Sequence, residues 1–154
     1  MSLDCIFCQI IAGESQAHII WEDEKHMAFL SIFPNTDGFT VVTTKKHYSS
    51  YAFDQEDKVL TDLLLASKKV AKRLNAAFSD VGRIGFVLEG YGVDHLHSKL
   101  IPMHGTPRGQ WKKMSSKVDK FFEKYEGYLS SHDYKREDEE KLKRIALKIR
   151  VSKA

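Results

Sequence analysis

The arrangement of short apolar segments near the N-terminus places the strongest constraint on how this chain can fold. Segments 18–21, 27–32 and 39–44 each have the length and the apolar, β-branched and aromatic content of a β-strand. They are separated only by the short polar segments 22–25 and 34–38. A parallel pair needs a crossover of roughly a dozen residues or more, so these links favour antiparallel neighbours.

Helices are predicted on either side of these strands. Residues 5–12 are expected to form a short helix that ends at Gly13, because glycine is common just past a helix C-terminus. Asp54 is a plausible N-cap for a long helix. Its apolar residues recur at three- and four-residue spacings or their multiples, and they predict a buried stripe of Leu60, Leu64, Ala71, Leu74 and Phe78.

The rest of the chain adds two strands and a C-terminal segment. Strands are predicted over 85–88 and 96–103, and the composition turns basic and aromatic after Gly105. Asp133 is expected to cap a last helix, one face of which is marked by Leu142, Ile145 and Ile149. The aromatic residues of this segment are expected to pack on the domain or on a second subunit: Trp111, Phe121, Phe122, Tyr125 and Tyr128.

Composition excludes several classes of protein. No apolar run approaches the roughly 18 residues of a membrane span, and a signal-peptide pattern is missing, so we expect a cytoplasmic protein with no membrane partner. The net charge of +3 is too small to indicate a nucleic-acid partner by itself. Cys5 and Cys8, the only cysteines, form one Cys-x-x-Cys, which is not the pattern of a secreted disulfide scaffold. A metal half-site and a redox pair both remain open.

The segment His95-Leu96-His97-Ser98-Lys99 carries the clearest chemical signal. Alternate side chains of a strand share a face, so His95, His97 and Lys99 are expected to form one row. Two imidazoles and an ammonium suit an anionic ligand, because burying the cation without a partner is costly. The alternative is a half-exposed strand whose polar residues simply face water.

This row, followed by Leu100-Ile101-Pro102, resembles the His-x-His-x-His hallmark of the histidine triad (HIT) superfamily, with Lys99 in place of the third histidine. Other matching motifs occur in the family's order: the Cys-x-x-Cys segment 5–14, which resembles zinc-bearing members, then Met27-Ala28-Phe29-Leu30-Ser31-Ile32, Gly38-Phe39-Thr40-Val41-Val42 and Lys46-His47. The resemblance covers roughly two thirds of the chain, from about Cys5 to Pro102.

The resemblance implies an α+β fold with an antiparallel sheet of about five strands, a short N-terminal helix and one long helix, usually in a homodimer. We therefore expect a HIT-like catalytic domain over 1–105 and a C-terminal extension over 106–154, packed on the same domain or on a dimer partner. The family's mechanism implies that His97 attacks the α-phosphate of a nucleotide and forms a covalent nucleotidyl-histidine. A neutral imidazole is a competent nucleophile near pH 7 if one ring nitrogen is held protonated.

Lys99 is the main departure from the family pattern. Histidine changes its protonation state readily, whereas lysine is normally a fixed cation with three donors. Lys99 is therefore expected to stabilise charge on the phosphoryl oxygens, an effect worth about 3 kcal/mol in comparable sites. It is less suited to passing a proton to a leaving group, which leaves hydrolase and transferase activity both open.

The resemblance also implies a ligand set for the cysteine motif. In zinc-bearing relatives the metal is held by two cysteines and two histidines, which map to Cys5, Cys8, His47 and His95. Such a closed tetrahedral site would be structural and would not carry out the chemistry. A redox pair and unliganded thiols remain as alternatives, although no strand precedes the motif as a thioredoxin-like site requires.

The resemblance places the nucleoside pocket on residues before the catalytic row. Phe7, Phe29 and Ile32 are candidates for its apolar wall, and Gly92 lies in a glycine-containing loop whose amides would be near the phosphate. Ser31 stands where relatives often have Asp or Asn for the ribose hydroxyls, so that contact would be weaker or water-mediated.

Together these features predict a nucleotide hydrolase or nucleotidyltransferase that acts on a small-molecule nucleotide. The alternative is a catalytically weak nucleotide-binding or zinc-stabilised interaction protein, in which Lys99 and Ser31 mark lost catalysis. A nucleic-acid partner is less favoured, because the C-terminal segment that carries the basic residues also carries Glu123, Glu126, Asp133 and Glu137 to Glu140.

Overall fold

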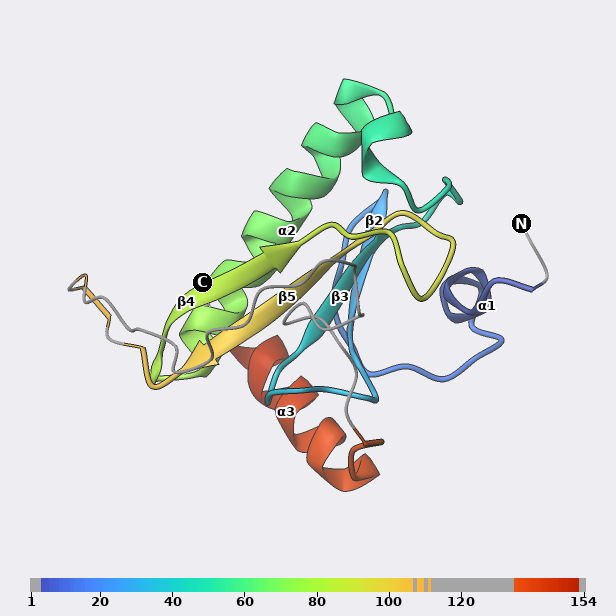
Figure 1. Cartoon of the computed structure of the whole chain (residues 1–154). Helices are drawn as coiled ribbons and strands as arrows, with labels where there is room; N and C mark the ends of the chain where they lie inside the picture. The colour runs from blue at the N-terminus through green and yellow to red at the C-terminus, as the bar shows by residue number, and fades with distance from the viewer. Residues whose placement is uncertain (1–3, 107, 110, 112–134, 153–154) are drawn as a thin grey trace, which may run out of the picture.

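The computed structural model describes residues 4–106, 108–109, 111 and 135–152 (Figure 1). Its centre is a five-stranded antiparallel sheet in the order β1-β2-β3-β5-β4. The strands are β1 Ile19–Glu22, β2 His26–Leu30, β3 Thr40–Thr44, β4 Val81–Val87 and β5 His97–His104. The predicted α+β class and the antiparallel sheet are confirmed.

Both faces of the central strands are covered. On β2, Ala28 and Leu30 belong to the core under the long helix, whereas Met27 and Phe29 belong to a second apolar cluster on the opposite face. That second cluster includes Phe7 of helix α1, Ile6–Ala12. Every residue of β2 and β3 is therefore buried.

Helix α2, Asp57–Ala77, lies across one face of the sheet (Figure 1). Its N-cap is Glu56. Asp54 instead ends a separate 3-10 helix, Ala52–Asp54, so the predicted cap at Asp54 is wrong. Of the predicted stripe, Leu74 and Phe78 are buried in the core and Leu60 and Ala71 pack against it, whereas Leu64 is 52% exposed, so the prediction is wrong for Leu64. The buried residues are Leu63, Ala66, Ser67, Val70, Leu74 and Ala77.

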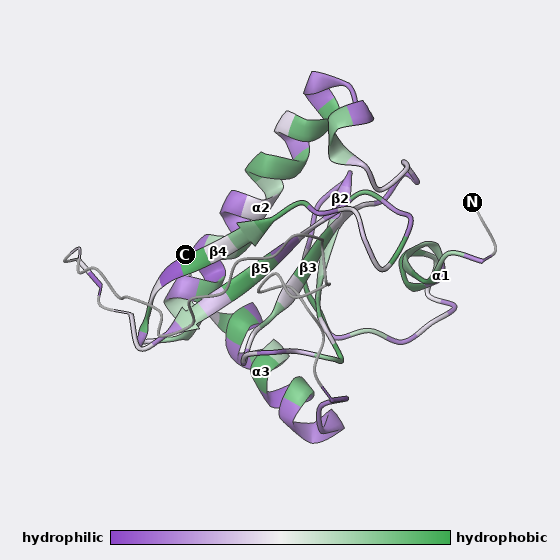
Figure 2. Cartoon of the chain, in the orientation of Figure 1, coloured by the Kyte–Doolittle hydropathy of each residue, from purple (hydrophilic) through white to green (hydrophobic). Residues whose placement is uncertain are grey.

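Helix α3, Glu139–Val151, completes the core beside α2. The Asp138 side chain accepts a hydrogen bond of 2.9 Å from the backbone N–H of Lys141 and so caps the helix. Leu142, Ala146 and Ile149 face the core, and both α2 and α3 show mixed polar and apolar surfaces (Figure 2). The predicted cap at Asp133 lies outside the described residues, as do the aromatics of the C-terminal segment except Trp111, which is exposed.

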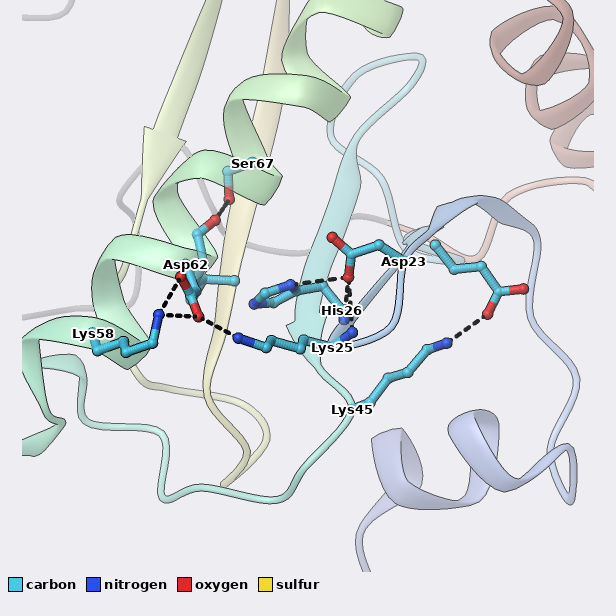
Figure 3. A network of polar contacts seen from close by, with 9 residues as sticks. Asp23, Lys25, His26, Lys45, Lys58, Asp62 and Ser67 are labelled. Atoms are coloured by element: carbon cyan, nitrogen blue, oxygen red, sulfur yellow. Dashed lines mark hydrogen bonds and ion pairs between the residues drawn. The ribbon is translucent and has the colours of Figure 1, made fainter.

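Polar contacts connect the β1–β2 turn to the start of α2 (Figure 3). Asp62 accepts hydrogen bonds from Lys25 at 2.9 Å and from Lys58 at 3.4 Å. These pairs lie at the surface, where solvent screens the charges, so they contribute little to stability. Among the helices in the described part of the chain, none has the length and hydrophobicity needed to cross a membrane.

Candidate functional site

Residue alternation along β5 separates the site from the core. Leu100 belongs to the core under α2, and the hydroxyl of Ser98 lies 2.8 Å from that of Ser67 on α2. His97 and Lys99 have the opposite parity, and both line a cavity on the other face of the sheet. The predicted row is therefore correct for these two residues. His95 precedes the strand and takes part in a separate cluster.

The His97 ring is held in one tautomer. Its Nδ1 lies 2.6 Å from the backbone carbonyl oxygen of His95, and since a carbonyl can only accept, Nδ1–H donates. In the neutral ring the lone pair is then on Nε2. Burial lowers the pKa of His97 from its ordinary value, and the nearby Lys99 ammonium lowers it further. The ring is therefore neutral near pH 7 and has a free nucleophilic nitrogen.

Lys99 is joined to an acidic residue that the sequence reasoning did not single out. Its Nζ donates a hydrogen bond to Oε1 of Glu89, which lies between β4 and β5. The side chains are 14% and 8% exposed, respectively. The sequence carries no spacing that pairs Glu89 with Lys99, so this contact is visible only in the structure.

A second cluster lies beside the start of β5. Cys5, Cys8, His47 and His95 each offer one ligand atom, and these atoms all lie within 4.8 Å of one another. Sγ of Cys5 is 3.4 Å from Nδ1 of His95, and Sγ of Cys8 is 3.4 Å from Nδ1 of His47. With bonds of about 2.3 Å to sulfur and about 2.0 Å to nitrogen, a tetrahedral zinc site has sulfur–nitrogen separations of about 3.5 Å. The cluster therefore fits a metal ion of this kind.

The orientation of His95 suits metal binding. Its Nε2 lies 2.7 Å from the Thr44 carbonyl oxygen and therefore donates to it. This contact leaves the lone pair on Nδ1, the atom that faces both cysteine sulfurs. Burial lowers the pKa of His95 below its ordinary value, which favours the neutral form that a metal requires.

The cavity beside His97 has a volume of about 310 Å³, which is in the range of small-molecule sites. Its lining residues come from α1, the end of β2, the start of β3, the β4–β5 loop and β5. Every residue predicted to contact a nucleotide lines it: Phe7, Phe29, Ser31, Ile32 and Gly92. The structure thus brings these five residues together with His97 and Lys99 in one space.

The walls of the cavity differ in chemistry. The Phe7 ring meets the Phe29 ring edge-on at 5.3 Å and the His97 ring at 5.2 Å, so one wall is aromatic. On another side the Ser31 hydroxyl accepts a hydrogen bond of 3.1 Å from the Phe33 N–H and still has its own proton to donate. Gly92 adopts φ +94°, a conformation that other residues rarely adopt, and it shapes the loop over the cavity.

Comparison with known proteins shows the same domain. The family model described as HIT domain matches residues 12–106. An uncharacterized HIT-like protein of Methanocaldococcus jannaschii is 36% identical over 65% of this chain and 79% of its own length. The adenosine 5'-monophosphoramidase of Saccharomyces cerevisiae is 30% identical over 75% of each chain. The crystal structure of a hypothetical histidine triad nucleotide-binding protein of Sulfolobus tokodaii superposes with a TM-score of 0.70 at 25% identity, covering 95% of this chain and 89% of that one.

Proposed function

The chain belongs to the HIT domain family, and from this premise we propose that it is a nucleotide hydrolase or nucleotidyltransferase in which His97 becomes covalently linked to the nucleotide. The observation that carries the proposal is the state of His97. Its Nδ1–H is bound to the His95 carbonyl, and the ring lines a cavity of nucleotide size. Among the relatives, the yeast protein is a phosphoramidase by name, an enzyme of the same broad class.

The proposed reaction has two steps. Nε2 of His97 attacks the α-phosphorus while the bond to the leaving group breaks, and Lys99 balances negative charge on the phosphoryl oxygens. Water or another acceptor then attacks phosphorus and releases His97. Phe7, Phe29 and Ile32 would pack against the base, Ser31 would contact the ribose, and the loop at Gly92 would lie over the phosphate.

Zinc is the proposed occupant of the cysteine–histidine cluster. Two thiolates and two imidazoles suit zinc and, at four ligands, leave no open position for a water nucleophile. Its role would be to fix α1 and the start of β5. A metal site of reduced cysteines is also consistent with the proposed location in the cytoplasm, where thiols stay reduced.

A homodimer is the proposed assembly. Strand β4 is one of the two edge strands of the described sheet, and Phe86 on it is 41% exposed. Leu64 and Leu65 of α2 are also half exposed. In a homodimer, the exposed edge of β4 would pair with a strand of the second copy. The exposed apolar side chains would be buried between the two copies.

The experiment that tests the proposal is trapping of the intermediate. Wild-type protein incubated briefly with a nucleotide labelled at the α-phosphate, then quenched in base, should retain about one label per active chain, and His97→Ala should retain none. His104→Ala is the control, because His104 contacts Asp80 and the Asp37 carbonyl and does not line the cavity. Label on His97→Ala equal to wild type would refute the assignment.

One observation favours a second candidate. Lys99 is already paired with Glu89, so its charge is partly balanced before any substrate binds. A catalytically weak nucleotide-binding or zinc-stabilised interaction protein would have this property. Mononucleotide binding without any trapped label or turnover would select this second candidate.

A further inference from the structure

The ion pair between Lys99 and Glu89 has a consequence for substrate choice. Both side chains are largely buried, and the ammonium donates directly to the carboxylate. If Lys99 gave up its proton, the Glu89 carboxylate would be left buried beside a neutral amine, which is costly. Lys99 is therefore held as a cation that can attract phosphoryl oxygens but resists giving a proton away.

Few other groups in the cavity could supply that proton. Among the lining residues that the structure describes, His97 must act with its lone pair, and the remaining ionisable side chain is Tyr91. Tyr91 is 64% exposed, so most of its side chain faces solvent rather than the enclosed part of the cavity. The described lining of the cavity therefore offers no effective proton donor to a leaving group that needs protonation.

We infer that the site, if it acts as proposed above, selects nucleotides whose leaving group departs as a stable oxyanion, such as phosphoanhydrides and acyl-phosphate anhydrides, over phosphoramidates of alkylamines. As Nε2 of His97 forms the N–P bond, the P–O bond breaks and its electron pair stays on the leaving phosphate or carboxylate oxygen. No proton is needed. In a phosphoramidate the P–N bond must break instead, and the nitrogen must gain a proton to depart as a neutral amine.

The second step is common to both substrate classes. A water oxygen attacks phosphorus, the N–P bond breaks, and its electron pair returns to Nε2. The proton lost by the water passes to solvent, and the product is the nucleoside monophosphate. The leaving group thus affects only the first step, which is where selection between substrates occurs.

The test uses two substrates matched in nucleoside, α-phosphate and size. Adenosine 5'-(4-nitrophenyl phosphate) releases a stable oxyanion, and adenosine 5'-(N-benzyl phosphoramidate) releases an amine. Wild type should have a kcat/KM at least about 10²-fold higher for the ester, since a general acid typically contributes 10²-fold or more. Lys99→His supplies a titratable donor and should narrow this ratio about tenfold. Glu89→Gln removes the carboxylate that keeps the proton on Lys99, so it should also narrow the ratio of ester to amide kcat/KM.

A second measurement needs no variant. Across a series of substituted phenyl esters, wild-type kcat/KM should rise steeply with the acidity of the phenol, because no proton transfer offsets the leaving-group charge. Comparable rates for the ester and the amide, or a flat dependence on phenol acidity, would overturn the inference but leave the proposed function standing. Selective loss of amide turnover in Tyr91→Phe would also overturn it, by identifying Tyr91 as the donor. Absence of turnover and of label with every substrate would instead remove the proposed function itself.

Discussion

Nδ1 of His97 donates a 2.6 Å hydrogen bond to the backbone carbonyl of His95, so the proposed nucleophile is oriented by the residue that belongs to the metal cluster. The side chain of His95 faces Cys5 and Cys8, whereas its carbonyl faces His97. Any change that releases the His95 side chain therefore also loosens the backbone that sets the His97 tautomer. Under the proposed function, metal binding and catalysis would therefore be coupled through one residue, although the metal would not touch the substrate.

Cys8→Ser should abolish zinc binding and destabilise the fold. Cys8 is the right position because its sulfur lies near both His47 and His95. A metal present at about a thousandfold excess over its Kd stabilises the folded state by about 4 kcal/mol. In a chain of this size its loss corresponds to a fall in Tm of roughly 10 °C. Elemental analysis and thermal unfolding of metal-replete protein check both effects.

His18→Ala is the matched control for the metal prediction. His18 is a histidine whose Nε2 pairs with Glu139 at 3.0 Å, and it lies outside the cluster. Its zinc content should equal that of wild type, at about one ion per chain. Unchanged zinc content in Cys8→Ser, or unchanged stability after verified zinc removal, would contradict a structural metal at this place.

Ser67→Ala should destabilise the protein more than Ser98→Ala. The Ser67 hydroxyl donates to the Leu63 carbonyl at 2.8 Å and accepts from Ser98, and both serines are essentially inaccessible. Removal of Ser67 leaves the Ser98 hydroxyl buried without its partner, at a cost of about 2 kcal/mol. Removal of Ser98 leaves Ser67 still bonded to Leu63 and should cost about 1 kcal/mol.

The double variant checks this asymmetry. Ser67→Ala/Ser98→Ala removes the unpaired hydroxyl as well, so its loss of unfolding free energy should be smaller than the sum of the two single losses. Urea unfolding measures all three values. If the loss in the double variant equals the sum of the two single losses, the hydrogen bond between Ser67 and Ser98 contributes nothing to stability.

Phe7→Leu should weaken nucleotide binding and, because Phe7 is buried, lower the free energy of unfolding by about 1 kcal/mol. The Phe7 ring contacts the rings of Phe29 and His97, and its removal takes an aromatic edge from the cavity wall. An aromatic contact of this kind is worth about 0.5 to 1.5 kcal/mol, so the Kd for AMP should rise roughly two- to tenfold. Phe53→Leu is the control, because Phe53 is 80% exposed and does not line the cavity. Equal affinities of the two variants, measured calorimetrically, would exclude Phe7 from the base wall.

Much of the fold was predictable because strand length, short turns and alternation are local properties of the sequence. The β5 alternation placed His97 and Lys99 on one face without any knowledge of the partner strands. The phase of α2 was not predictable in the same way. Leu63, Leu64 and Leu65 are consecutive, so the apolar pattern fits more than one face, and only packing against the sheet selects Leu63.

Contacts that join distant segments were the least predictable part of the site. Glu89 and Lys99 are ten residues apart on opposite sides of a loop, and no spacing rule brings them together. His95 was expected to share a row with His97 and Lys99, but it precedes β5, and its side chain faces the cysteines. The family resemblance, rather than periodicity, placed His95 with Cys5 and Cys8.

The last prediction separates the electrostatic role of Lys99 from its role in holding Glu89. Lys99→Ala removes a preorganised cation and should slow formation of the nucleotidyl intermediate about 10²-fold without preventing it. The same change removes the ammonium that pairs with the buried Glu89 carboxylate and should cost about 3 kcal/mol of stability. A slow Lys99→Ala enzyme alone therefore cannot distinguish lost charge stabilisation from a damaged cavity.

The double variant Lys99→Met/Glu89→Gln resolves these two causes, because it removes both charges and keeps the volume of each side chain. Replacement of a buried ion pair by neutral residues of similar size is often nearly neutral, so the unfolding free energy should return to within about 1 kcal/mol of wild type. If Lys99 acts through its charge on the phosphoryl group, the rate of labelling of His97 should nevertheless remain about 10²-fold below wild type. Rapid-quench measurement of label incorporation, beside urea unfolding of the same samples, gives both quantities. Recovery of the wild-type labelling rate together with the stability would show that Lys99 serves only to pair Glu89.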